Sequence, residues 1–194
     1  MTNVLILGAN GSIARVAIDL FLNETDVQLT LYLRHSRRLK NLESNQVRII
    51  EGDVLDIETL KEAMVGQDVV YANLAGQLER MAKNVVEAMN LTGVKRLVWI
   101  SSMGIYDEVP GERYSSILNP YRDSAAIIES SDLDYTIIRP GWFTNKDEVD
   151  YELTHKGEPF KGHDISRKSV ADLVVKLATT PGMEIRSSLG ISKP

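Results

Sequence analysis

The chain has 194 residues, a formal net charge of −5 at pH 7 and no cysteine. This length fits one domain with a substantial core, and the interspersed, mildly acidic charge disfavours nucleic acid and anionic membrane surfaces as partners. Without cysteine there is no disulfide or thiolate nucleophile, and the scattered histidines, His35, His155 and His163, do not predict a metal site.

The N-terminal segment predicts a strand, a tight turn and a helix in direct succession. An apolar run over residues 4–7 leads into Gly8-x-x-Gly11-x-x-Ala14, and apolar residues then recur at helical spacing. Gly8 can adopt a backbone conformation that other residues avoid, and Gly11 lets the main chain approach a pyrophosphate. Ser12 and the free N–H groups of the first helical turn would face the phosphates, where the helix dipole favours an anion. The segment therefore indicates nucleotide binding rather than a surface turn that happens to contain two glycines.

The second predicted strand, Gln28–Leu33, ends in a basic loop. In a doubly wound sheet this loop lies beside the adenosine ribose, where an acidic residue would bind the 2′-hydroxyl of NAD. Arg34 stands there instead, and a guanidinium group binds phosphate, so Arg34, supported by Arg37 or Arg38, predicts a preference for NADP. A solvated basic loop is the alternative, and we favour it for Arg38 and Lys40.

A short third strand, Val47–Ile50, leads to the edge where adenine would lie. Asp53 could accept a hydrogen bond from the adenine amino group, and Val54 would lie beside the base. Asp53 could equally cap a helix over Ile57–Val65, for which Asp56 competes. The two roles of Asp53 are compatible, so both remain open.

The fourth strand, Asp68–Asn73, is followed by small residues that allow a dinucleotide to cross the strand end closely. We assign Leu74, Ala75 and Gly76 to this crossing. A helix over Leu78–Leu91, stopped by Gly93, and a strongly apolar fifth strand, Val94–Ile100, come next. Alternating strands and helices predict a Rossmann-type doubly wound parallel sheet in a three-layer α/β/α domain, with the ligand at the carboxyl ends of the strands.

The fifth and sixth strands deliver candidate substrate contacts to that same edge. The Ser101 hydroxyl could orient a carbonyl substrate, or it could terminate the strand by bonding nearby backbone. A loop then leads to a helix over Tyr121–Ser130 and to a sixth strand, Tyr135–Ile138. Four residues follow that would form a fixed turn and a rigid apolar wall for the nicotinamide or a flat substrate: Pro140, Gly141, Trp142 and Phe143.

The C-terminal part predicts a small excursion that covers the site, over about residues 143–165, with a hairpin as one form. Ser166 is expected to cap the last helix, Lys168–Thr179, and Arg186–Ile191 to form a final edge strand. We therefore expect a single NAD(P)-binding domain over residues 1–194.

Four motifs together resemble the atypical short-chain dehydrogenase/reductases, in particular small NAD(P)-binding proteins related to NmrA and to biliverdin reductase B (flavin reductase). They are Gly8-Ala-Asn-Gly-Ser-Ile-Ala14, Gly52-Asp53, Ile100-Ser-Ser102 and Arg139-Pro-Gly-Trp-Phe143. The resemblance spans nearly the whole chain and implies a Rossmann domain. Its implied cofactor contacts are Gly8, Asn10, Gly11, Ser12, Ile13, Arg34, Asp53 and Ala75.

One departure from this family concerns the proton donor. Ordinary members carry Tyr-x-x-x-Lys, because four-residue spacing on a helix stacks the ammonium beside the phenol and lowers its pKa. Here Tyr121 is followed four residues later by Ala125, and no tyrosine has Lys at that offset. We therefore disfavour tyrosine-driven alcohol dehydrogenation and treat Tyr121 as a positioning residue, with Ser101 as the other catalytic candidate.

Two functions remain open. The first is an NADP(H)-dependent oxidoreductase that passes a hydride to a small flat acceptor, such as a flavin, a quinone or a carbonyl compound. The second is a non-enzymatic NADP(H)-binding redox sensor like NmrA. We expect an enzyme with a small-molecule substrate, as a monomer or weak homodimer. No run of 18 apolar residues occurs and the first apolar stretch is too short for a signal-peptide core, so we expect a cytoplasmic protein.

Overall fold

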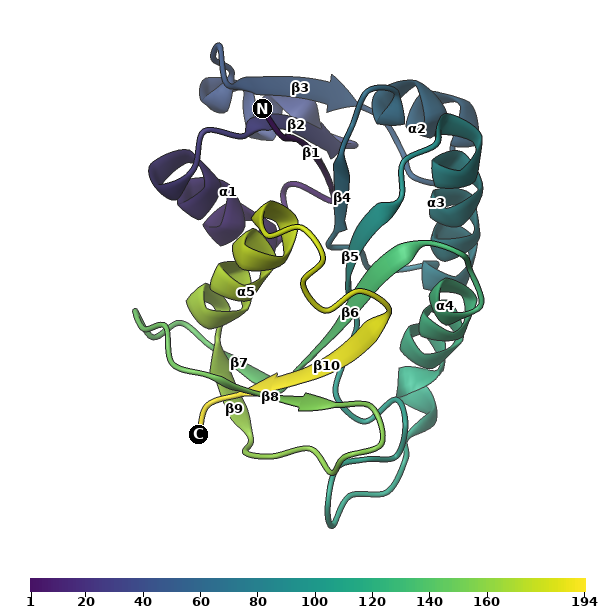
Figure 1. Ribbon diagram of the computed structural model, residues 1–194, viewed down its shortest axis with the longest axis vertical. Helices are drawn as coiled ribbons and strands as arrows, with labels where there is room; N and C mark the ends of the chain where they lie inside the picture. Colours follow the sequence, from purple (N-terminus) through teal and green to yellow (C-terminus); the bar gives the residue numbers. More distant parts are fainter.

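The apolar runs of the sequence form the strands of one central sheet, in a computed structural model that describes residues 1–194 (Figure 1). The sheet has eight strands in the order β3-β2-β1-β4-β5-β6-β10-β8. Its strands are β1 Asn3–Leu7, β2 Gln28–Leu33, β3 Val47–Glu51, β4 Val69–Ala72, β5 Arg96–Ile100, β6 Asp134–Pro140, β8 Glu152–His155 and β10 Ser187–Ser192. All neighbours pair in parallel except β8, which runs antiparallel to β10. The predicted Rossmann-type doubly wound fold is confirmed.

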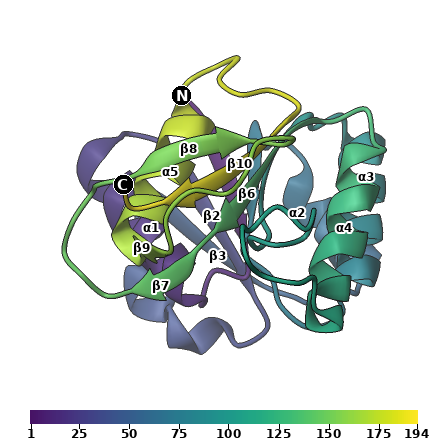
Figure 2. The ribbon, with the colours of Figure 1, turned by 90° about the horizontal axis from the view of Figure 1, so that it is seen from below.

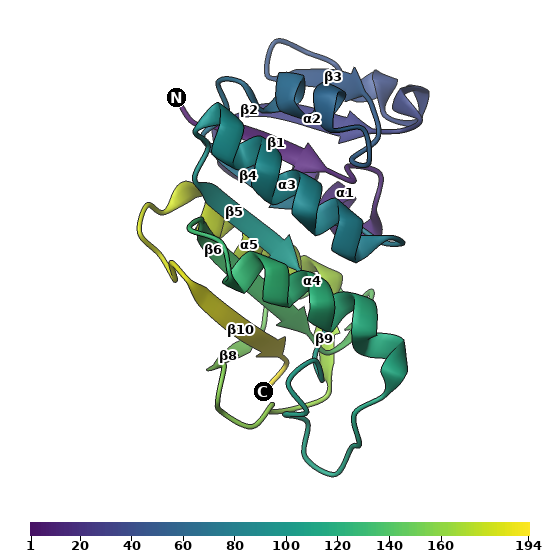
Figure 3. The same ribbon diagram turned by 90° about the vertical axis from the view of Figure 1, so that its right-hand side faces the viewer.

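Helices cover both faces of this sheet (Figures 1 and 3). They are α1 Ser12–Glu24, α2 Ile57–Met64, α3 Leu78–Thr92, α4 Asn119–Glu129 and α5 Arg167–Thr179, with short 3-10 turns at Ser36–Arg38, Lys40–Leu42 and Ser116–Leu118. Helices α1 and α5 pack on one face, and α2, α3 and α4 on the other. None of the α-helices combines the length and the apolar character that crossing a bilayer requires.

The strands read as continuous apolar runs because both of their faces are buried. Alternate side chains of β1 enter different cores: Val4 and Ile6 pack toward α1 and α5, whereas Leu5 and Leu7 pack toward α2 and α3. A strand that faces solvent on one side would instead alternate apolar and polar residues. The unbroken run at residues 4–7 therefore encodes a central position in the sheet.

The helix termini follow the sequence signals. Gly93 ends α3 in the left-handed region at φ +79°, and the Ser166 side chain accepts a hydrogen bond from Ser169 N at the start of α5, as predicted. Of the two candidates for the N-cap of α2, Asp56 is the one that caps the helix, and its carboxylate accepts hydrogen bonds from Glu58 N and Thr59 N. Asp53 instead accepts from Leu55 N at 2.9 Å and shapes the turn before the helix.

Two expectations for the C-terminal part are wrong. The segment before α5 is not a hairpin, because β8 pairs with β10 while a short β9, Asp164–Ser166, pairs in parallel with β7, Trp142–Thr144. The last strand is also not an edge strand, since β10 lies between β6 and β8. Strand β8 can pack beside β10 because residue 190 is a glycine. A Cβ at Gly190 would lie only 2.4 Å from Thr154 Oγ1 of β8. Figure 2 shows the β7–β9 pair on the side of the sheet that α1 and α5 cover.

Candidate functional site

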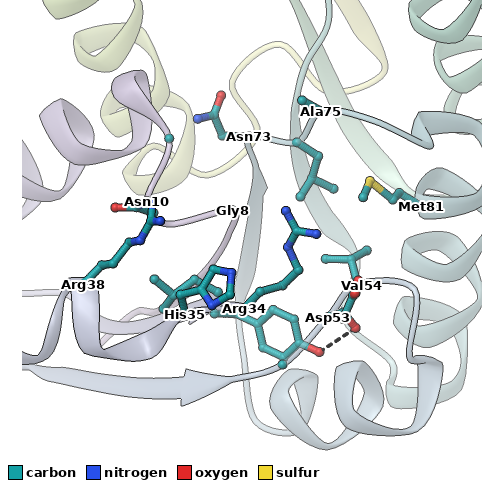
Figure 4. Close-up of a pocket in the computed structure, with 15 residues that line it drawn as sticks. Gly8, Asn10, Arg34, His35, Arg38, Asp53, Val54, Asn73, Ala75 and Met81 are labelled. Atoms are coloured by element: carbon teal, nitrogen blue, oxygen red, sulfur yellow. Dashed lines mark hydrogen bonds between the residues drawn. The ribbon is translucent and has the colours of Figure 1, made fainter.

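A cavity of about 340 Å³ opens where β1, β2, β3 and β4 end (Figure 4). Eight of the residues predicted to bind the cofactor line it: Gly8, Asn10, Gly11, Arg34, Asp53, Val54, Leu74 and Ala75. These residues come from four separate loops. Parallel strands bring their carboxyl ends to one edge of the sheet, so the topology alone gathers them.

The glycine-rich turn packs directly against the end of β4. Gly8 has φ +73°, and a Cβ on it would lie 2.1 Å from the main-chain oxygen of Asn73. A Cβ on Gly11 would lie 2.2 Å from the Asn73 side-chain nitrogen Nδ2. The space beside Gly11 in which a pyrophosphate is expected thus also borders Asn73, a lining residue that the sequence motifs do not single out. Its position after a central strand was the available signal.

Four predicted cofactor residues line neither this cavity nor the second one described below. Ile13 belongs to α1 and its side chain is buried in the core, so its main chain alone can face a ligand. Ser12 opens α1, and its Oγ accepts a hydrogen bond from Arg167. Gly76 is the last residue of the small-residue crossing after β4, and Arg37 lies on the 3-10 turn after β2, but neither contributes to the lining.

Basic side chains from the loop after β2 line this cavity, namely Arg34, His35 and Arg38. Figure 4 shows the Arg34 guanidinium group in the middle of the lining residues and that of Arg38 next to Asn10. The 3-10 turn over Ser36–Arg38 brings Arg38 to the cavity in place of Arg37, and Arg38 remains exposed to solvent there. Neither arginine forms an ion pair with a carboxylate. Their charges remain available for an anion.

The nearby carboxylate of Glu51 is engaged by the loop itself. It accepts from Ser36 N at 3.1 Å and from Ser36 Oγ at 3.0 Å. The backbone hydrogen bond from Ser36 is the main cause that lowers the pKa of Glu51 below its usual value. Glu51 therefore fixes the basic loop at the end of β3 and leaves the arginines unpaired.

Buried Tyr32 supports the part of the cavity wall that contains Asp53. Its hydroxyl donates to the main-chain oxygen of Asp53 at 2.9 Å, shown as the dashed line in Figure 4. Burial is the main cause that raises the pKa of Tyr32. Its ring lies so close to Gly52 that a Cβ there would be 2.5 Å from the phenol oxygen. The Gly52-Asp53 motif is thus shaped by a tyrosine from β2.

A second cavity, of about 470 Å³, opens where β5 and β6 end. It contains the remaining predicted contacts: Ser101, Tyr121, Pro140, Gly141, Trp142 and Phe143. Trp142 and Phe143 are 59% and 41% exposed, so each presents a flat apolar face to a ligand. Because β4 and β5 are neighbours in the sheet, the two cavities lie next to each other at its carboxyl edge.

The Ser101 hydroxyl is buried in this cavity wall without a hydrogen-bond partner. Its main-chain N–H continues the ladder to Ile138 O, but its side chain does not bond to the backbone. The neighbouring Ser102 takes that role, since its Oγ donates to Met103 O at 2.9 Å. Because a buried polar atom without a partner is rare, Ser101 Oγ is suited to bond a ligand.

The loop that covers the second cavity is anchored by a buried ion pair. The Arg139 side chain is fully buried and pairs with Glu108 of that loop. Arg139 also donates to Ser188 Oγ at 2.9 Å and to Ser188 O at 3.1 Å, and its guanidinium carbon lies 4.9 Å from the centre of the Tyr106 ring. Phe160 N donates to Glu108 O at 2.9 Å. One buried arginine thus joins the loop after β5 to β6, to β10 and to the C-terminal excursion.

The fold does not rebuild a catalytic Tyr–Lys pair from distant residues. Lys156 Nζ lies 4.5 Å from the centre of the Tyr106 ring, which is the nearest such arrangement to the second cavity. However, the Tyr106 hydroxyl bonds with Glu129 at 3.0 Å and Ser188 at 2.9 Å, and burial raises its pKa. Tyr106 lines neither cavity. Tyr121 does line the second cavity, without a lysine beside it.

A parallel sheet in this strand order, with a glycine-rich turn after β1 and a ligand cavity at its carboxyl edge, defines a dinucleotide-binding Rossmann protein. The model of the NAD(P)H-binding family matches residues 8–181, and the chain belongs to this family.

Solved structures agree with this assignment. A Rossmann-fold NAD(P)-binding family protein from Shigella flexneri is 44% identical, covering 100% of this chain and 94% of that one, with a TM-score of 0.90. A wide-type short-chain dehydrogenase/reductase from Veillonella parvula in complex with NADP is 26% identical, covering 100% and 95%, with a TM-score of 0.91. The resemblance to the atypical short-chain dehydrogenase/reductases is confirmed.

Two further relatives are identical to this chain at about a quarter of their aligned residues. An NAD(P)H azoreductase from Xenophilus azovorans is 24% identical over 190 residues, which cover 93% of this chain and 65% of the relative. An uncharacterized sugar epimerase, YhfK, from Bacillus subtilis is 26% identical over 160 residues, covering 74% and 73%. The two names describe different reactions.

Proposed function

We propose that this protein is an NADP(H)-dependent reductase that delivers a hydride to a small flat acceptor, such as a flavin, a quinone or a carbonyl compound. The observation that carries the proposal is the pair of cavities at one sheet edge. The first has a glycine-rich turn and unpaired arginines, and the second has exposed aromatic faces and an unpartnered buried hydroxyl.

The residues of the first cavity fit a dinucleotide. Gly8 and Gly11 keep side chains away from the crossing at β4, and α1 begins without a side-chain cap, so its first N–H groups are free for phosphate oxygens. Arg34, with Arg38 beside it, would bind the 2′-phosphate of NADP through its planar fork of donors. Asp53 would lie beside the adenine. When bound, the cofactor supplies the hydride itself.

The chain would hold the acceptor in the second cavity. Trp142 and Phe143 provide a flat wall, and the turn before them is rigid, since a Cβ on Gly141 would lie 2.3 Å from His163 O. Ser101 Oγ would donate to an oxygen of the acceptor, and Tyr121 would position it from α4. Acceptors such as flavins and quinones need little help with protons, which suits a cavity without a Tyr–Lys pair.

The absence of that pair also favours a second candidate, a redox sensor that binds NADP(H) without turnover. Oxidation of NADPH by a panel of flavins, quinones, aldehydes and azo compounds distinguishes the two. Turnover of any class, reduced in the Ser101→Ala variant, would support the reductase. Tight NADPH binding in calorimetry with no oxidation by the whole panel would refute the reductase and favour the sensor.

A further inference from the structure

Arg167, the first residue of α5, connects the glycine-rich turn with the wall of the second cavity. Its Nε donates to Ser12 Oγ at 3.1 Å, and its Nη1 donates to Asn145 Oδ1 at 2.7 Å. Its guanidinium carbon lies 5.1 Å from the centre of the Phe143 ring. Ser12 follows Gly11 of the first cavity, and Phe143 belongs to the second. Arg167 therefore lies between the two candidate ligand positions.

The charge of Arg167 is not compensated by the protein. Both of its hydrogen-bond partners are neutral, and it takes part in no ion pair. The next residue shows the contrast, because Lys168 pairs with Asp147 at 2.7 Å. A half-buried guanidinium group with neutral partners loses hydration without gaining a counter-charge, which favours a ligand that brings one.

The adjoining end of α1 also attracts a negative group. Gly11 is its N-cap and offers no side-chain hydrogen bond, and the first turn carries no acidic residue. A dinucleotide that reaches from the adenosine cavity to the acceptor cavity must place its doubly charged pyrophosphate along this helix end. The residues of the glycine-rich turn that line the first cavity, Gly8, Asn10 and Gly11, carry no positive charge. A cation for the pyrophosphate would therefore have to come from another segment.

We propose that Arg167 is the cation that binds the cofactor pyrophosphate, exchanging its bond to the Ser12 hydroxyl for one to a phosphate oxygen while it stays stacked on Phe143. The guanidinium group is suited to this exchange because its remaining donors can hold Asn145 and a phosphate together. The proposal rests on cofactor binding, which is a property of the family, and not on hydride transfer.

The test compares Arg167→Met with a control variant, Lys168→Met. Both substitutions remove a positive charge from the N-terminal end of α5, but only Arg167 contacts Ser12 beside the glycine-rich turn. Calorimetric titrations use NADPH, NADH and adenosine 2′-monophosphate, which lacks the pyrophosphate. Arg167→Met should weaken NADPH and NADH by the same factor, about ten- to a hundredfold, and leave adenosine 2′-monophosphate unchanged. Arg167→Lys should recover part of the loss, since it keeps the charge without the planar fork. Lys168→Met should bind all three ligands as the wild type does.

Three results would overturn the proposal. Unchanged binding of NADPH and NADH by Arg167→Met would show that Arg167 only joins α5 to α1. An equal loss for adenosine 2′-monophosphate would indicate a general effect on the fold, which circular dichroism would record. An equal loss in Lys168→Met would point to long-range electrostatics. Because no acceptor is present, these outcomes are independent of whether the protein turns over.

Discussion

Arg34 is the residue on which cofactor choice is expected to depend most. It follows β2 directly, lines the first cavity and has no carboxylate partner. The carboxylate of Glu51, at the end of β3, is engaged by Ser36 of the loop after β2. The 2′-phosphate of NADP would therefore meet a free guanidinium group instead of a competing anion.

We predict that the protein prefers NADPH over NADH and that Arg34→Ala removes most of this preference. A hydrogen bond to a charged group contributes about 1.5–3 kcal/mol, so NADPH should bind roughly ten- to a hundredfold more weakly. NADH lacks the phosphate and should be nearly unaffected. Calorimetry with both cofactors measures this, and added salt should reduce the preference. Equal losses for both cofactors would make Arg34 structural, and a wild type that favours NADH would contradict the prediction.

Tyr121 should matter little for the chemical step. It lines the second cavity without the lysine that would lower the pKa of a catalytic phenol. We predict that Tyr121→Phe changes the rate less than tenfold, whereas loss of a general acid costs about 10²–10⁴-fold. Steady-state rates with the best acceptor of the panel provide the measurement. A loss on the larger scale with intact cofactor affinity would mean that another group activates the phenol.

At the scale of elements, the glycine-rich turn has two glycines with different tasks. Gly8 has positive φ and lies against the backbone of Asn73, whereas Gly11 has φ −64° and lies against the Asn73 side chain, which can rotate. Gly8 therefore serves the fold, and Gly11 serves mainly the approach of a ligand.

This difference predicts opposite outcomes for two variants. Gly8→Ala should lower the free energy of unfolding by more than about 1 kcal/mol, because a side chain there is strained and meets backbone atoms. Gly11→Val should abolish NADPH binding with little change in secondary structure. Circular dichroism, thermal unfolding and calorimetry on both variants separate the effects. NADPH affinity retained in Gly11→Val would move the phosphate site elsewhere.

The loop over the second cavity is predicted to depend on its buried ion pair. Removing one partner of such a pair costs about 3–5 kcal/mol, because the other charge stays buried and uncompensated. Glu108→Gln should therefore lower the free energy of unfolding by about that amount, while Glu112→Gln, an exposed carboxylate of the same loop, should change it by less than about 0.5 kcal/mol. Denaturant titration measures both. Equal stabilities would mean that the pair does not hold the loop.

In the molecule as a whole, the two cavities lie at one edge of the sheet, apart from most of the core residues. Its interior and both helical layers form the cores, and its carboxyl edge carries both cavities. Substitutions at this edge that spare Gly8 and the Arg139–Glu108 pair are therefore expected to change ligand affinity while the fold persists. Variants of Arg34 and Arg167 are therefore expected to lose ligand affinity without unfolding.

The class of fold, the order of its main elements and the residues of the glycine-rich turn could all be predicted from the amino-acid sequence. These follow from local signals: unbroken apolar runs for strands buried on both faces, helical spacing, Gly93 and Ser166 at helix ends. The loops after each strand could be placed at one edge for the same reason, since parallel strands share a direction.

Features that depend on contacts between distant segments became visible only in the folded structure. The interior position of β10 in the sheet is one such feature. The sequence could not predict it, because the fit of Thr154 against Gly190 leaves no trace in local periodicity. The fold also pairs Arg139 with Glu108, leaves Ser101 Oγ without a partner and brings Arg167 to Ser12, a residue 155 positions away. Propensity and periodicity describe short stretches of chain, whereas burial and charge compensation are properties of the folded molecule as a whole.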